Sequence, residues 1–158
     1  MSRYKVWYDV YSENFRPFNS VEYVFTQRFV GSQRNCVDWI VEEFEIDISE
    51  LNGATILFAR YWGGSWDGTA FVLFLRDGKL YEVNGDHCSC FGLEGQWEPE
   101  EASIAELRHR MEEGELGIDR FDEDGNFADK LKIVLDLFEA GKMDRKIGNP
   151  VYKNPESN

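Results

Sequence analysis

The fold is decided by residues 54–83, which read ATILFARYWGGSWDGTAFVLFLRDGKLYEV. Residues 54–61 and 69–75 are continuous apolar runs of strand length, and such runs are typical of a sheet that is covered on both faces. Asp77 and Gly78 predict a two-residue hairpin turn, because both residues tolerate the positive φ angles that this turn requires. The segment therefore predicts antiparallel pairing between residues 69–75 and the strand that follows the turn.

Two further strands are expected before this segment. Tyr4–Tyr11 is rich in Tyr, Val and Trp, and these residues favour a strand. Val21, Tyr23 and Phe25 then alternate with polar residues, which indicates a second strand extending toward Phe29. The pattern predicts a small antiparallel sheet of about four or five strands.

Three helices are expected to pack on this sheet. The first begins after Asn35, which is a favourable helix cap. The second has Pro99 at its first position and ends before Gly114, and the third is capped by Asn126 and ends before Gly141. Apolar residues recur at helical spacing in all three segments: Val37, Ile40, Val41 and Phe44; Ile104, Leu107 and Met111; Phe127, Leu131, Val134, Leu135 and Phe138.

Sheet and helices together predict an α+β fold class. The length of 158 residues fits one α+β domain, which we place at residues 1–142, followed by an extended polar tail at residues 143–158. No apolar run approaches the roughly 20 residues that a membrane-spanning helix needs, and the N-terminus has no apolar signal core. We therefore expect a cytoplasmic protein whose three cysteines are kept as thiols.

Charge is distributed unevenly along the chain. The net charge is −13, and residues 94–129 alone hold 13 acidic and 3 basic residues. Such a negative field repels nucleic acid and anionic membranes and attracts basic surfaces. We therefore expect neither a direct nucleic-acid partner nor a membrane partner, and the oligomeric state stays open.

Residues 87–101, HCSCFGLEGQWEPEE, combine possible metal ligands with carboxylates. His87, Cys88 and Cys90 are competent zinc ligands, but C-x-C is tighter than the C-x2-4-C spacing of structural zinc sites. A nucleophilic thiol needs a base or a positive environment, and the carboxylates that follow are expected to raise a thiol pKa. We interpret the stretch as a turn into the helix at Pro99 and predict no catalytic residue, metal or cofactor. A zinc- or thiol-dependent enzyme remains an alternative.

A second candidate site is the glycine-rich loop between the first two long strands. It carries aromatic residues beside an acid, at Tyr61, Trp62, Trp66 and Asp67. Aromatic side chains in such loops anchor partners because they bury a large area at little entropic cost. Burial of the same rings against the sheet is the alternative interpretation, because large aromatic residues are mostly buried.

Residues 81–100 carry the pattern Y-E-V-x-G-x-x-C-S-C-x-G-L-E-G-Q-W-x-P-E. Together with GTAFVLFLRDGKLYEV at residues 68–83, this pattern resembles a group of small, mostly uncharacterised proteins encoded by tailed bacteriophages and prophages. The likeness covers about a third of the chain, centred on residues 54–112. It carries no assigned reaction, and it implies a small accessory phage protein that acts in the bacterial cytoplasm.

The leading hypothesis combines this context with the acidic segment. The chain is expected to bind a host or defence protein of basic surface and inhibit it, as anti-CRISPR or anti-restriction proteins do, by occupying a groove that normally holds nucleic acid. The alternatives are the enzyme considered above and an adaptor that binds through its aromatic loop. The acidic candidates are Glu94, Glu98, Glu100, Glu101, Glu112, Glu113, Glu115, Asp119, Asp122, Glu123 and Asp124.

Overall fold

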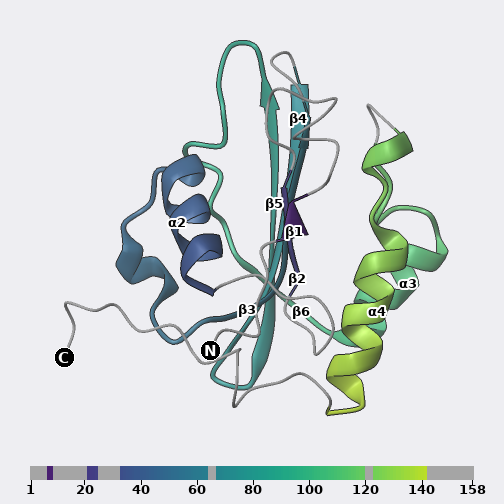
Figure 1. The fold of residues 1–158 in the computed structure, drawn as a ribbon. Helices are drawn as coiled ribbons and strands as arrows, with labels where there is room; N and C mark the ends of the chain where they lie inside the picture. Colours follow the sequence, from purple (N-terminus) through teal and green to yellow (C-terminus); the bar gives the residue numbers. More distant parts are fainter. Residues whose placement is uncertain (1–6, 9–20, 25–32, 64–66, 120–122, 142–158) are drawn as a thin grey trace.

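The computed structural model describes residues 7–8, 21–24, 33–63, 67–119 and 123–141, with side chains from residue 37 onward (Figure 1). The proposed tail, Trp66 and Asp122 lie outside the described residues. So do most of the strand expected at Tyr4–Tyr11 and the extension expected toward Phe29. No helix in the described part of the chain is long and apolar enough to cross a membrane.

An antiparallel sheet forms the centre of the molecule, and the predicted α+β arrangement is confirmed. Its six strands within the described ranges follow one another in chain order, so each strand pairs with its sequence neighbour. The sixth, β6, was not expected from the sequence. The strands are β1 (Trp7–Tyr8), β2 (Val21–Val24), β3 (Thr55–Gly63), β4 (Asp67–Arg76), β5 (Lys79–Cys88) and β6 (Glu100–Ala102).

The helices cover both faces of this sheet, as the apolar strands predict. Helix α2 (Gln33–Phe44) lies on one face, while α3 (Ile104–Glu112) and α4 (Ala128–Glu139) lie on the other (Figure 1). Two short 3-10 helices, η1 (Ile48–Leu51) and η2 (Glu123–Gly125), complete the described secondary structure.

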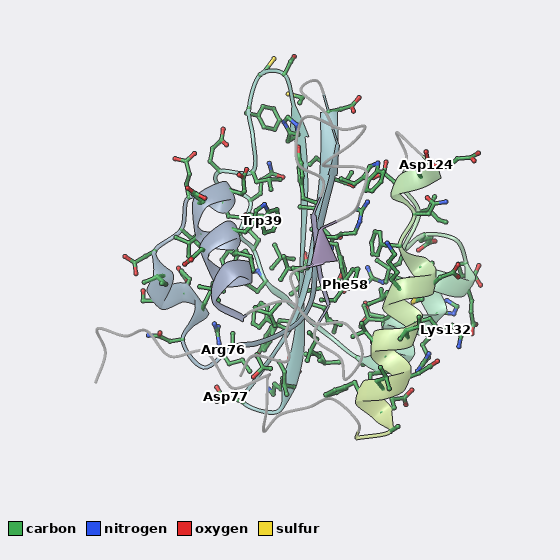
Figure 2. The ribbon with its side chains drawn as sticks, in the orientation of Figure 1. Trp39, Phe58, Arg76, Asp77, Asp124 and Lys132 are labelled. Carbon is green, nitrogen blue, oxygen red and sulfur yellow. The ribbon has the colours of Figure 1, made fainter. Side chains whose placement is uncertain are left out.

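Strand register decides which side chains meet each helical layer. Phe58, Arg60 and Trp62 of β3 pair with Leu73, Phe71 and Thr69 of β4, and alternation places these six on one face. Phe58 points toward α4, and Trp39 lies on the α2 side (Figure 2). The predicted turn is also confirmed, because Asp77 and Gly78 have φ angles of 52° and 76°.

The second predicted helix begins later than expected. Pro99 lies in the loop before β6, and α3 starts after Ser103, whose hydroxyl accepts a hydrogen bond from the Glu106 N–H at 3.1 Å. Ser103 followed three positions later by Glu106 is a capping-box pattern, which outweighs the preference of proline for a first turn. Residues 100–101 are therefore in a strand and not at a helix N-terminus.

The caps expected at Asn35 and Asn126 are also wrong. Helix α2 begins at Gln33, so Asn35 lies within it. The residue before α4 is Phe127, and Asn126 instead accepts a hydrogen bond through Oδ1 from the Asp119 N–H at 2.7 Å. The end of α4 is as predicted, since Gly141 follows it with a φ angle of 68°.

The motif of residues 87–101 forms the connection from β5 to β6, and it folds back over the α2 face. Trp97 stacks on Phe74 of the sheet at 5.9 Å between ring centroids and meets Phe44 of α2 edge-on at 5.2 Å. Gly85 lies beneath the loop, and a Cβ there would lie 2.9 Å from Leu93 Cδ2, so any larger residue would require the Leu93 side chain to shift. The loop is thus part of the core layer on this face.

Gln96 holds the same loop against the edge of β5. Its side-chain amide accepts a hydrogen bond from the Asp86 N–H at 2.8 Å, and it donates to the carbonyls of Asp86 and Gly92 at 2.6 and 2.7 Å. The amide therefore replaces a neighbouring strand at this point, where β6 does not extend.

Substitution Gln96→Ala should lower the free energy of unfolding by about 1–3 kcal/mol, because three hydrogen bonds to backbone groups are lost at once. Urea denaturation of both proteins measures the difference. Glu98→Ala is the matched control, since it lies in the same loop with an exposed side chain and should change stability by less than about 0.5 kcal/mol. Equal midpoints for the two variants would show that the amide does not stabilise this edge.

Candidate functional site

Five of the acidic candidates gather around the connection between α3 and α4. The backbone brings the two ends of this connection together, because the Phe127 N–H donates to the Gly117 carbonyl at 2.8 Å. Gly117 is required for this contact, since its φ angle is 88° and a Cβ would lie 2.6 Å from Ala128. We call these five exposed residues the acidic connection; they are Glu112, Glu113, Glu115, Glu123 and Asp124.

Most carboxylates of the acidic connection form no ion pair within the described part of the chain. Among the described residues, none forms an ion pair with Glu112, Glu113, Glu115 or Glu123. Figure 2 shows Asp124 on the same side of the sheet as α4. Because exposed carboxylates without partners repel one another, their charge is available to a cationic surface.

The rest of the outer surface of α3 and α4 is different, because most of its acidic side chains are paired with cations. Arg108 of α3 pairs with Asp136 at 2.8 Å and with Glu139 at 2.5 Å, both on α4. Lys132 also pairs with Asp136, at 2.9 Å. The pKa of the Asp136 carboxyl is held below its ordinary value by hydrogen bonds, first from Lys132 and then from Arg108. Most of the exposed carboxylates of α3, α4 and their connection for which no ion pair with a described cation is seen therefore lie in the acidic connection.

Four other acidic candidates lie away from this connection. Glu94 and Glu98 are exposed in the β5–β6 loop, on the α2 side of the sheet, and Glu100 and Glu101 lie in β6. Glu101 also has a cation nearby, since its Oε1 is 3.9 Å from Lys79 Nζ. The acidic segment predicted as one surface is thus divided between the two sides of the sheet.

Asp119 is a correction to the predicted binding surface, because its side chain is buried and paired. Its Oδ2 lies 3.5 Å from Arg60 Nη2 and accepts a hydrogen bond from the Thr69 hydroxyl at 2.7 Å. Arg60 itself is fully buried; its Nη1 donates to Thr69 at 3.2 Å and its guanidinium lies 4.4 Å from the Phe127 ring centroid. Asp119 therefore anchors the α3–α4 connection to the sheet.

A second buried carboxylate ties α3 to the sheet in the same way. Glu82 of β5 is 4% exposed, and its Oε2 pairs with Arg110 of α3. Its other oxygen accepts a hydrogen bond from the Asn84 amide at 2.9 Å. Sequence reasoning missed both buried pairs, although Arg60 and Glu82 stand within otherwise apolar strand segments, and that placement was the available signal.

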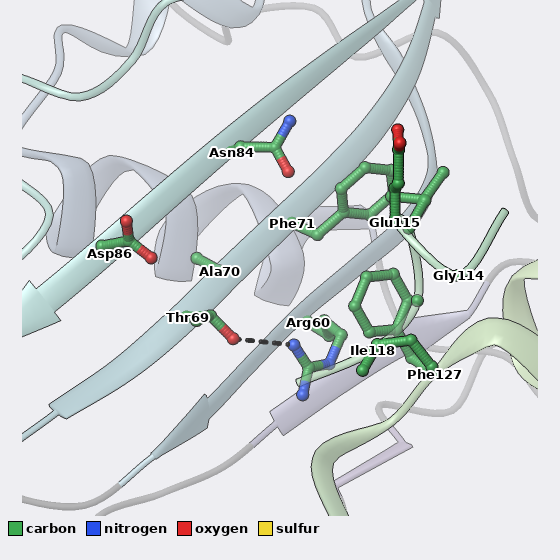
Figure 3. Close-up of a pocket in the computed structure, with 12 residues that line it drawn as sticks. Arg60, Thr69, Ala70, Phe71, Asn84, Asp86, Gly114, Glu115, Ile118 and Phe127 are labelled. Atoms are coloured by element: carbon green, nitrogen blue, oxygen red, sulfur yellow. Dashed lines mark hydrogen bonds between the residues drawn. The ribbon is translucent and has the colours of Figure 1, made fainter. Parts of the chain in front are cut away.

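A cavity of about 390 Å³ opens between the sheet and the acidic connection (Figure 3). Arg60 and Thr69 lie on its sheet side, and Phe127 borders it from the helical side. Glu115 of the acidic connection and Asp86 of β5 also line it, and both are exposed. A groove bordered by carboxylates and aromatic rings suits a cationic side chain.

The aromatic side chains of the glycine-rich loop are not all exposed to solvent. Trp62 is 1% exposed, and a Cβ on Gly125 would lie 2.5 Å from its Cδ1, so Trp62 packs against η2 and is not a partner-binding residue in this structure. Tyr61 is half-buried, and its ring centroid lies 6.2 Å from that of Trp39. Burial raises the pKa of Tyr61 to about 12, and the negative charges of Glu43 and Asp67 add to this shift. Asp67 begins β4 and is half-buried.

The cysteine-rich turn lies at the end of β5. His87 faces the α2 side, where its ring centroid is 5.8 Å from that of Tyr61, whereas Cys88 follows it at the alternate position of the strand. Cys88 is half-buried and Cys90 is exposed, and both are free thiols. In the part of the chain that the structure describes, no group of three or more His, Cys, Asp or Glu side chains is placed to hold a metal ion.

A scan against protein-family models, a search of curated proteins and a search of solved structures found no match to this chain. The function proposed for it therefore depends on the chemistry of the side chains described above. The likeness of residues 81–100 to phage-encoded proteins stays a prediction, because these comparisons do not test it.

Substitution Asp119→Ala should lower the free energy of unfolding by about 3–5 kcal/mol, because it leaves the Arg60 guanidinium buried without its carboxylate. Thermal or urea denaturation measures the loss. Glu123→Ala removes an exposed carboxylate from the acidic connection and should cost less than about 0.5 kcal/mol. If Asp119→Ala were as stable as this control, the ion pair would not anchor the connection.

Proposed function

We propose that this chain is a non-enzymatic binding protein that inhibits its partner by placing the acidic connection on a basic surface. The observation that supports this proposal is the concentration at this end of the molecule of four exposed carboxylates that form no ion pair with a described cation, those of Glu112, Glu113, Glu115 and Glu123. Elsewhere on α3 and α4, arginine and lysine side chains pair with Glu106, Asp136 and Glu139. A solvated helix surface that served solubility alone would not need this separation.

The geometry of the connection favours a rigid display of charge. The Leu116 N–H donates to the Arg110 carbonyl at 3.1 Å, and Leu116 itself is buried. Gly117 is bonded to the start of α4, and Asp119 is paired with Arg60 of the sheet. Because the backbone is held at these points, fewer conformations are lost when the carboxylates meet a partner, which reduces the entropic cost of binding.

The partner that suits this surface is a protein whose groove binds nucleic acid. Such grooves line up lysine and arginine side chains against closely spaced phosphates, and carboxylates held on a rigid surface compete for the same cations. Together with the likeness to phage-encoded proteins, this favours a host or defence protein in the bacterial cytoplasm, of the CRISPR or restriction type. The nucleic acid itself is repelled by the net charge of −13.

The adaptor alternative receives less support. Its anchors were the aromatic residues of the glycine-rich loop, and the burial of Trp62 removes one of them. Tyr61 is packed beside Trp39, and Trp66 lies outside the described residues. The acidic connection is therefore the surface that we assign to partner binding.

The triple variant Glu112→Lys, Glu113→Lys, Glu115→Lys should weaken partner capture. Tagged chain is incubated with bacterial lysate, and the bound proteins are identified by mass spectrometry at low and high salt and with added double-stranded DNA or RNA. A nucleic-acid-handling protein should be captured by the unaltered chain, released by salt and displaced by nucleic acid, since screening and competition act on the same contacts. The triple variant should bind it about tenfold or more weakly.

The matched control reverses three exposed acids on the α2 side, Asp38→Lys, Glu42→Lys and Glu98→Lys, so the net charge changes equally. This control should retain the partner. Equal loss in both triple variants would mean that net charge alone governs capture. Capture that resists salt, nucleic acid and the triple reversal would exclude the acidic connection as the binding surface.

A further inference from the structure

Cys88 and Cys90 are brought together by the turn that ends β5. The Cys90 N–H donates to Cys88 Sγ at 3.3 Å, and the Cys88 N–H donates to the Phe91 carbonyl at 3.1 Å, so the chain doubles back within four residues. Cys90 is exposed and Cys88 is half-buried, so neither residue is enclosed in the core. Two thiols separated by one residue on a closed turn form a potential dithiol site.

The electrostatics of this turn differ from what the acidic sequence predicts. The pKa of the Cys88 thiol is lowered, above all by the Cys90 N–H and also by the Phe91 N–H and the Cys90 side chain. Partial burial and the Glu94 carboxylate oppose the shift without reversing it. Backbone donors in direct contact with a sulfur atom stabilise its thiolate form more strongly than the nearby carboxylate destabilises it.

We propose that Cys88 and Cys90 form a reactive dithiol site that undergoes thiol–disulfide exchange with small-molecule disulfides of the glutathione type. Cys88 is the attacking thiol, because backbone N–H groups surround its sulfur. Cys90 is the resolving thiol, because it is exposed and adjacent. His87 does not act as the base in this proposal, since it packs against Tyr61 on the α2 side.

The exchange balances in two steps. The Cys88 thiolate attacks one sulfur atom of oxidised glutathione, so a mixed disulfide forms and one glutathione thiolate leaves. The Cys90 thiolate then attacks Cys88 Sγ, so the Cys88–Cys90 disulfide forms and the second glutathione leaves. The protein dithiol is oxidised, and one glutathione disulfide is reduced to two thiols. Cysteines two residues apart in a tight turn give an exposed disulfide that is reduced easily, so the site is reversible.

The experiment uses the full unaltered chain. Tryptic digestion afterwards separates Cys36 from Cys88 and Cys90, so no cysteine has to be substituted. Cleavage after Lys79 and Arg108 releases Cys88 and Cys90 in one peptide, and Cys36 leaves in another. The reduced protein is incubated in buffers of increasing oxidised-to-reduced glutathione ratio, quenched with acid and alkylated. Mass spectrometry should show the 80–108 peptide passing from two alkylated thiols to an internal disulfide.

Variants assign the two roles. Cys90→Ser should accumulate one glutathione on Cys88, at an initial rate several-fold higher than Cys88→Ser shows at Cys90. Glu94→Gln should react faster than the unaltered chain, whereas Glu98→Gln should not, because of these two carboxylates Glu94 is the one that raises the Cys88 pKa. The difference in rate between the two cysteine variants should vanish in concentrated urea, where the turn is lost.

Three results would overturn the proposal. The first is a 80–108 peptide that keeps two alkylated thiols at every glutathione ratio. The second is glutathione that stays on the unaltered chain without an internal disulfide. The third is equal rates for Cys90→Ser and Cys88→Ser in the folded protein, with folding checked by circular dichroism. Since no partner protein is present, none of these results depends on the proposed inhibitory function.

Discussion

Strands β3 and β4 bury side chains on both faces over most of their length, and this double burial dictates the layers of the molecule. A sheet of this kind cannot leave one face to solvent, because each large apolar side chain gains about 1.5–3 kcal/mol only when it is fully covered. Helix α2 supplies one cover, with Val37, Ile40 and Phe44 completely buried. Helix α4 supplies the other, with Leu131, Val134 and Leu135.

Covering both faces forces the chain to cross the sheet after β5, and this crossing divides the acidic segment. The β5–β6 loop stays on the α2 side, where Trp97 packs between Phe44 and Phe74, and the chain then passes through β6 to α3 on the opposite side. Carboxylates that are close in sequence are therefore separated in space. The charged surface available to one partner is smaller than the composition suggests, but it is better defined, because Gly117 and Asp119 fix its position.

The parts of the fold that could be predicted are those that local patterns determine. The continuous apolar runs gave β3 and β4, the Asp77–Gly78 turn gave the hairpin, and Gly141 gave the end of α4. Strand β6 has the sequence Glu-Glu-Ala, which has no strand pattern, and it forms because the edge of β5 is available. The Arg60–Asp119 pair joins residues far apart in the chain, so only the folded structure could place it. The rings of the aromatic loop were assigned wrongly in part, because the same residue types serve both cores and binding sites.

Counting charges along the sequence led to wrong predictions for the Cys88 pKa and for the exposure of Asp119. The distances between the interacting groups explain both cases. For Cys88, the Cys90 N–H at 3.3 Å outweighs the Glu94 carboxylate, because a donor in contact with the sulfur is unscreened whereas an exposed charge is weakened by water. For Asp119, contact with Arg60 and Thr69 turns a predicted surface charge into a buried anchor. A buried pair of this kind adds little net stability, since desolvation offsets much of its attraction. At the acidic connection no described cation pairs with four of the five carboxylates, so there the count of charges does describe the exposed surface.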